Sequence, residues 1–128
     1  MPNRKSKEYI EKIVAPIIDQ INNPDFESCD DMLVELSVSF GYLAEELFEN
    51  KQYTEIADVF FKIVRELTDY DEYFYTYETA YSLAQVNELD NAEMMCEYLE
   101  DINQYDQGML NKIYELKKII KNKKMSKE

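Results

Sequence analysis

The side chains best able to do chemistry in this sequence are carboxylates and tyrosines. The 128 residues include 27 Asp and Glu and 11 Tyr, but no His. Without an imidazole there is no histidine general base and no Ser-His pair. Paired carboxylates occur by chance in so acidic a chain, so their presence does not indicate catalysis. The sequence therefore predicts a protein that is not an enzyme.

Metal and phosphate sites find little support either. Zinc would have only two cysteines, Cys29 and Cys96, with carboxylates as further ligands. Gly41 and Gly108 are the only glycines and cannot form a phosphate-binding loop. The acidic segment 69–72 could hold a hard cation weakly, but it lacks the Gly and terminal Glu of a calcium loop. We therefore expect no metal and no other cofactor.

The formal net charge of −13 is unevenly distributed along the chain. Residues 15–111 carry 23 acidic and three basic groups, whereas residues 112–128 carry seven Lys and two Glu. An acidic body should repel nucleic acid and anionic membranes and attract basic partners. A solvated surface that only confers solubility would explain the same charge. The C-terminal lysines suit a helix C-terminus, where cations are favoured, better than a nucleic-acid site.

The compartment is predicted from three features. The two cysteines are far apart and lack CxxC spacing, so we expect reduced thiols, with Cys96 as a small buried side chain. The early apolar run at 13–18 is too short for a secretory signal. No stretch reaches the ~18 apolar residues of a membrane span. We expect a cytoplasmic protein with no membrane partner.

Apolar residues recur at spacings of three and four along most of the chain, as in amphipathic helices. Two Gly and three Pro leave little turn material for a many-stranded fold. The pattern predicts a single all-α domain of about six helices. The expected segments are an N-terminal helix at 5–22 containing Pro16, a first hairpin at 29–68, a second hairpin at 72–104 whose first helix spans 73–86, a C-terminal capping helix at 105–121, and a frayed basic tail at 122–128.

The two central hairpins repeat each other with a fixed period of 36 residues. A fixed period of this size is typical of stacked helical hairpins. The equivalent pairs are Ala44 and Ala80, Leu47 and Leu83, Tyr53 and Leu89, Ile56 and Ala92, Phe60 and Cys96, and Ile63 and Leu99.

These hairpins resemble the tetratricopeptide repeat. The first supplies the family pattern with Phe40, Leu43, Ala44 and Leu47, then Ile56, Phe60 and Ile63; the second supplies Thr76, Thr79, Ala80 and Leu83, then Ala92, Cys96 and Leu99. The period of 36 and the lack of a Pro after either hairpin depart from the family. The resemblance implies stacked antiparallel hairpins. Because such stacks need ~3 repeats, we expect the terminal helices to cap the ends, or a homodimer to complete the stack.

The resemblance also implies that the first helices of the hairpins line a concave groove. The positions carried over are Val38, Gly41, Glu45, Phe48 and Glu49 from the first hairpin, and Phe74, Tyr77, Tyr81, Ala84 and Gln85 from the second. The predicted partner-binding residues are Glu45, Phe48, Glu49, Phe74, Tyr77, Tyr81 and Gln85. Carboxylates would meet Lys or Arg, and tyrosine rings would accept cations or apolar groups. Packing against the neighbouring hairpin accounts equally well for each of the three second-hairpin rings.

The sequence thus predicts a non-catalytic interaction module, adaptor or chaperone-like, that binds a peptide segment with basic and apolar residues. Two alternatives stay open. One is an acidic inhibitor that mimics the charge of DNA, whose binding would weaken steeply with salt and depend on no single residue. The other is a homodimerisation module, which sedimentation over a concentration series would test.

Overall fold

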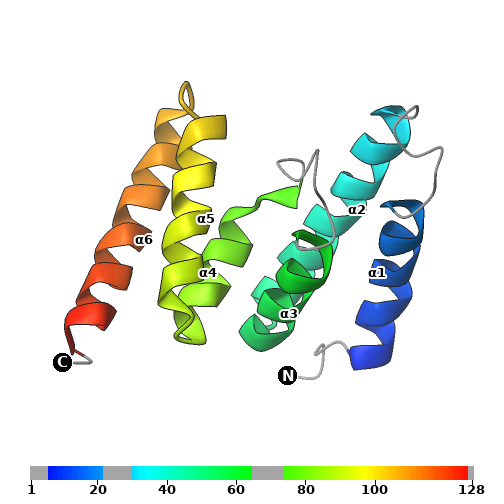
Figure 1. Cartoon of the computed structure of the whole chain (residues 1–128), viewed down its shortest axis with the longest axis horizontal. Helices are drawn as coiled ribbons and strands as arrows, with labels where there is room; N and C mark the ends of the chain where they lie inside the picture. The colour runs from blue at the N-terminus through cyan, green and yellow to red at the C-terminus, as the bar shows by residue number, and fades with distance from the viewer. Residues whose placement is uncertain (1–5, 22–29, 65–73, 127–128) are drawn as a thin grey trace.

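The structure, a computed structural model, describes residues 6–21, 30–64 and 74–126 of the chain. All regular structure in these ranges is helical, and they contain no strand. The helices are α1 (Lys7–Ile21), α2 (Asp30–Glu49), α3 (Tyr53–Val64), α4 (Tyr77–Gln85), α5 (Leu89–Ile102) and α6 (Gln107–Ser126) (Figure 1). The predicted all-α fold of about six helices is confirmed.

Two antiparallel hairpins, α2–α3 and α4–α5, stack side by side, and α1 and α6 lie at the two ends of the stack (Figure 1). The hairpins meet chiefly where α3 packs against α4. At one end α1 contacts both α2 and α3, and at the other end α6 contacts α5 and α4. The terminal helices therefore take the end positions that the sequence predicts for them.

The turns of the two hairpins have the same backbone structure, 36 residues apart. Lys51 and Asn87 both adopt left-handed conformations, with φ of 58° and 64°. The residue after each donates its N–H across the end of the preceding helix, which is the pattern of a Schellman motif. These bonds run from Gln52 N to Leu47 O at 2.8 Å and from Glu88 N to Leu83 O at 2.9 Å.

The repeat also determines which side chains are buried. In five of the six equivalent pairs both members are at most 4% exposed, namely Ala44 and Ala80, Leu47 and Leu83, Ile56 and Ala92, Phe60 and Cys96, and Ile63 and Leu99. The exception is Tyr53, which is half-buried where its equivalent Leu89 is buried. Small Ala44 and Ala80 let the paired helices approach closely, and the larger side chains fill the space around them.

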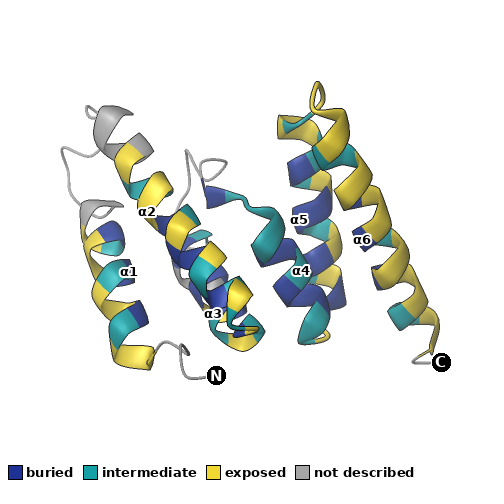
Figure 2. Ribbon diagram, turned by 180° about the vertical axis from the view of Figure 1, so that it is seen from behind, coloured by how far each residue is buried: buried dark blue, intermediate teal, exposed yellow. Residues whose placement is uncertain are grey.

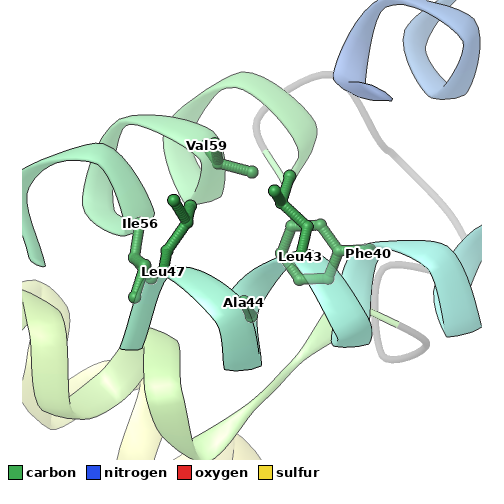
Figure 3. A pocket seen from close by; sticks show the side chains of 6 residues that line it. All are labelled: Phe40, Leu43, Ala44, Leu47, Ile56 and Val59. Carbon is green, nitrogen blue, oxygen red and sulfur yellow. The ribbon is translucent and has the colours of Figure 1, made fainter. Parts of the chain in front are cut away.

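The buried side chains form two apolar clusters that share α3. One joins α1, α2 and one side of α3; the other joins the opposite side of α3 to α4, α5 and α6. Figure 2 marks the buried residues along these helices in dark blue. The interface of α2 with α3 is closely packed and leaves no room for a water molecule between its apolar side chains. Those side chains, drawn in Figure 3, belong to Phe40, Leu43, Ala44, Leu47, Ile56 and Val59.

Two predicted boundaries differ from the structure, and a third feature, the helix through Pro16, does not. The first helix of the second hairpin begins at Tyr77 rather than at residue 73, because the Thr76 hydroxyl caps it by accepting the Thr79 N–H at 3.1 Å. α6 continues to Ser126 through the segment 122–126 that we expected to fray. Its last turns are held by Lys124, whose Nζ lies 3.0 Å from an Asp90 carboxylate oxygen. α1 runs through Pro16 without interruption.

Some sequence predictions fall on residues that the structure does not describe. These are the weak cation site at 69–72, the end of the first hairpin at 65–68, and Cys29. Among the described helices, none is both long and apolar enough to cross a membrane. Cys96 is fully buried as predicted, and burial raises the pKa of its thiol to about 12, so it is protonated and unreactive at neutral pH.

Candidate functional site

Four half-buried aromatic rings form a continuous row across three helices. Tyr81 of α4 lies at its centre, 5.2 Å between centroids from Phe48 of α2 and 5.6 Å from Tyr53 of α3. Tyr77, one turn earlier on α4, extends the row with a centroid 6.1 Å from that of Tyr81. The Phe48 and Tyr81 rings meet edge to face, which is a favourable geometry for aromatic pairs. Phe48, Tyr53, Tyr77 and Tyr81 are called the aromatic row below.

One end of the aromatic row already holds a cation. The Lys112 ammonium of α6 lies 4.5 Å from the centroid of the Tyr77 ring. A cation within ~6 Å of a ring centroid is attracted by the negative face of the ring. The row therefore reaches from α6 to α2, and the ring face of Tyr77 is shown to accommodate a basic side chain.

The helix at the other end of the row presents an exposed acidic face. Val38, Tyr42, Glu45 and Glu49 follow one another at spacings of four, three and four on α2, and all are exposed. Val38 and Tyr42 are 48% and 64% exposed, so their apolar surface is accessible to a ligand. Glu45 precedes Phe48 by less than one helical turn, so the carboxylates border the rings. A ligand crossing this region would meet rings, carboxylates and a partly apolar ridge.

The phenols of Tyr53 and Tyr77 are neutral at physiological pH. Burial, and secondarily the nearby Tyr81, raises the pKa of Tyr53 and of Tyr77 above the usual value of 10.0. For Tyr77, Cys96 and Glu78 add to the same shift. A neutral phenol can donate a hydrogen bond and still offer an apolar ring face. The row thus combines apolar contact with polar tips.

The predicted site residues separate into two groups in the structure. Glu45 and Glu49 are exposed, and Phe48, Tyr77, Tyr81 and Gln85 are half-buried, so all six reach the surface. Phe74 does not, and its predicted role in contacting a partner is wrong. It is completely buried before the start of α4, and its ring meets that of Phe40 edge to face at 5.5 Å. Ala84, a predicted groove position, is completely buried too.

Sequence reasoning missed three residues that shape this region. Tyr53 joins the row from α3 because it is the first residue of that helix and lies beside the end of α2. Tyr42 extends the acidic face, and its four-residue spacing from Val38 was a signal that could have found it. Lys112 lies 35 positions beyond Tyr77, and only the packing of α6 on α4 brings the two together.

No protein-family model, no curated protein and no solved structure matches this chain. Within residues 6–21, 30–64 and 74–126, no group of three or more Cys, Asp or Glu side chains is placed to hold a metal ion.

Proposed function

We propose that this protein is a non-catalytic interaction module whose aromatic row and α2 acidic face bind a peptide segment of another protein. The segment carries basic and apolar side chains, as the tetratricopeptide-like pattern of the sequence implies. The observation that carries the proposal is the continuous row of half-exposed rings bordered by the exposed carboxylates of Glu45 and Glu49. An adaptor or a chaperone would use such a surface in the same way.

The chemistry of the surface supports a basic and apolar ligand. Tyr and Phe rings offer large contact areas at low entropic cost and are enriched at interfaces. A Lys or Arg of the ligand would approach Glu45 and Glu49 on α2, since this part of the chain is strongly acidic. Apolar side chains of the ligand would cover the half-exposed rings and the exposed ridge of Val38 and Tyr42.

Lys112 acts as an internal competitor in this proposal. Its ammonium occupies the face of Tyr77 that a ligand cation would use. A ligand therefore binds over Tyr81 and Phe48 without disturbing it, or displaces it from Tyr77. Lys112→Ala distinguishes these two routes. If the ligand has to displace Lys112 from Tyr77, the variant should bind the ligand more tightly; if it binds beside Lys112, the affinity should not change.

Selection from a displayed library of random peptides on the immobilised full chain tests the proposal. The enriched sequences should combine Lys or Arg with aromatic or aliphatic residues. Their affinity should fall more than about tenfold for Tyr81→Ala and for Glu45→Lys with Glu49→Lys. Matched controls are Tyr105→Ala, at a fully exposed residue outside the site, and Glu97→Lys with Asp101→Lys on α5.

Two results contradict the proposal. Failure to enrich any peptide removes it, as does an equal loss of affinity in the control variants. If instead the protein competes with DNA for a DNA-binding protein, with a steep salt dependence and no dominant residue, the acidic body acts as a charge mimic.

A further inference from the structure

An open pocket of about 610 Å³ lies between α1 and α3, outside the site described above. Its floor is apolar and consists of Ile10, Val14 and Val59, and its rim carries the carboxylates of Glu11, Glu55 and Asp58, with Lys7 at its edge. A volume of this size lies within the range of ligand sites in proteins. The rim is net acidic, so the pocket favours an occupant that joins a cationic group to an apolar one.

The opposite end of the molecule presents a surface with that chemistry. On α6, Tyr114, Lys118, Lys121 and Met125 follow at spacings of four, three and four, so they form one ridge. All four are exposed, with Tyr114 at 45% and Met125 at 64%. This ridge points away from the side of α6 that packs on α4 and α5, where Ile113, Leu116 and Ile120 are buried.

We propose that the α6 ridge of one copy docks in the α1–α3 pocket of another copy. Met125 covers the apolar floor, while Lys118 and Lys121 approach the carboxylates of Glu11 and Asp58. The lengths match, because Lys118 to Met125 and Lys7 to Val14 each advance seven residues, or about 10 Å along a helix. In this contact the lysines of the ridge face the carboxylates of the pocket rim at short range, although each copy as a whole is acidic.

The contact is head-to-tail, because α1 and α6 lie at opposite ends of the stack (Figure 1). A contact between two different surfaces leaves one free pocket and one free ridge in every open complex, so association continues beyond a dimer until a ring closes. It is not the symmetric homodimer considered from the sequence. It extends a stack of two hairpins toward the ~3 or more repeats that such architectures need. The proposal does not depend on the peptide-binding surface.

Sedimentation velocity of the full chain over a concentration series tests the proposal. At an ionic strength of about 0.15 M, which screens the long-range repulsion between two acidic copies, the average mass should rise above the 15.3 kDa of a single chain and pass the mass of a dimer, and about 1 M salt should reduce it by screening the contact itself. The contact is small, so we expect weak and rapidly reversible association. A chain that sediments as a monomer at about 1 mM overturns the proposal, and so does a dimer that does not grow.

Charge reversal identifies the surfaces involved. Lys121→Glu alone and Asp58→Lys alone should each weaken association more than about tenfold, because each places like charges across the contact. A mixture of the two variants should restore it, since each then offers a surface complementary to the other. The matched controls Lys12→Glu and Asp101→Lys change the net charge equally at exposed positions outside the contact and should leave association unchanged. Equal effects in the controls, or no recovery in the mixture, overturn the proposal.

Discussion

The first helices of the two hairpins, α2 and α4, occupy equivalent places in the repeat but differ in how much of their surface is covered. α4 packs against α2, α3, α5 and α6, and five of its nine residues are buried. α2 is twenty residues long and leaves a whole face exposed, including Val38 and Tyr42. The backbone repeats, but the neighbours of each helix decide what its side chains can do. In this pair of helices α4 supplies packed rings, and α2 supplies the accessible charges.

One pair of equivalent positions illustrates this difference. Glu46 on α2 and Ser82 on α4 are 36 residues apart. Glu46 faces α1 and accepts the Tyr9 hydroxyl at 3.3 Å. Ser82 is completely buried, and its hydroxyl has no hydrogen-bond partner among the described residues. Equivalent positions therefore carry a hydrogen-bonded polar group in one hairpin and a buried polar group without a partner in the other.

The largest difference in stability between equivalent substitutions in the two hairpins is expected at Phe60 and Cys96. Both are buried, but a phenylalanine ring fills far more volume than a thiol. Phe60→Ala should lower the free energy of unfolding by about 3–5 kcal/mol through lost burial and a cavity. Cys96→Ala should cost about 1 kcal/mol, a typical value for a small change. Urea unfolding followed by circular dichroism measures both.

Phe60 contributes to the cluster between the hairpins, so its loss should weaken both of them together. Phe60→Leu is the matched control and should retain most of the stability, because it keeps most of the apolar volume. Equal losses of unfolding free energy for Phe60→Ala and Cys96→Ala would show instead that the two equivalent positions contribute equally to stability.

The second expected difference is a loss of stability at high pH to which Cys96 contributes and its equivalent Phe60 does not. Its pKa is about 12 in the folded chain, against 9.0 ordinarily, because burial disfavours the thiolate. Between these values the unfolded chain loses the thiol proton and the folded chain keeps it. The free energy of unfolding should therefore fall as the pH rises from about 9 toward 12. Measured against pH, the decline should be shallower in Cys96→Ala, and identical curves would contradict this.

Much of the fold could be predicted because the burial pattern is set by local periodicity. The 36-residue period placed Ala44, Ala80 and their apolar partners correctly, since buried apolar positions must recur on one face of each helix. The start of α4 was missed, although the Thr76-x-x-Thr79 spacing is close to a capping signal. The extension of α6 could not be predicted from spacing alone, because Lys124 is paired by residues of α5.

The candidate site was less predictable because it depends on contacts between helices. Tyr77 and Tyr81 could be placed on one face of a helix, but nothing local shows that Lys112 of α6 covers Tyr77. Phe74 reads as one ring among several tyrosines, but it is buried in the cluster with α1, α2 and α3, where its ring meets that of Phe40. Tertiary packing decides which rings of an aromatic segment remain at the surface.

A smaller difference in stability is expected when Gly is introduced in the two hairpin turns. Lys51 and Asn87 both have positive φ, where Gly has no steric penalty and Asn is tolerated better than Lys. Lys51→Gly should therefore raise the free energy of unfolding by about 1 kcal/mol, and Asn87→Gly by less. Thermal and urea unfolding would show the order. Lys51→Asn is the control for the lost charge and should give part of the increase in unfolding free energy. If Lys51→Gly is less stable than the original protein, Lys51 does not have the left-handed conformation described above.

The smallest effect on stability is expected at Ser82, where the polar side chain lacks the hydrogen bond that its equivalent in the first hairpin makes. Replacing this buried, unpaired hydroxyl by Ala removes a desolvated polar group and improves helix propensity. Ser82→Ala should therefore leave the protein as stable or raise the free energy of unfolding by about 0.5–1 kcal/mol. At the equivalent position Glu46→Ala should be destabilising, because it removes the acceptor for Tyr9. A loss of more than about 1 kcal/mol in Ser82→Ala, measured by urea unfolding, would mean that the hydroxyl does have a partner. Ser82 on α4 would then be hydrogen-bonded, as its equivalent Glu46 on α2 is.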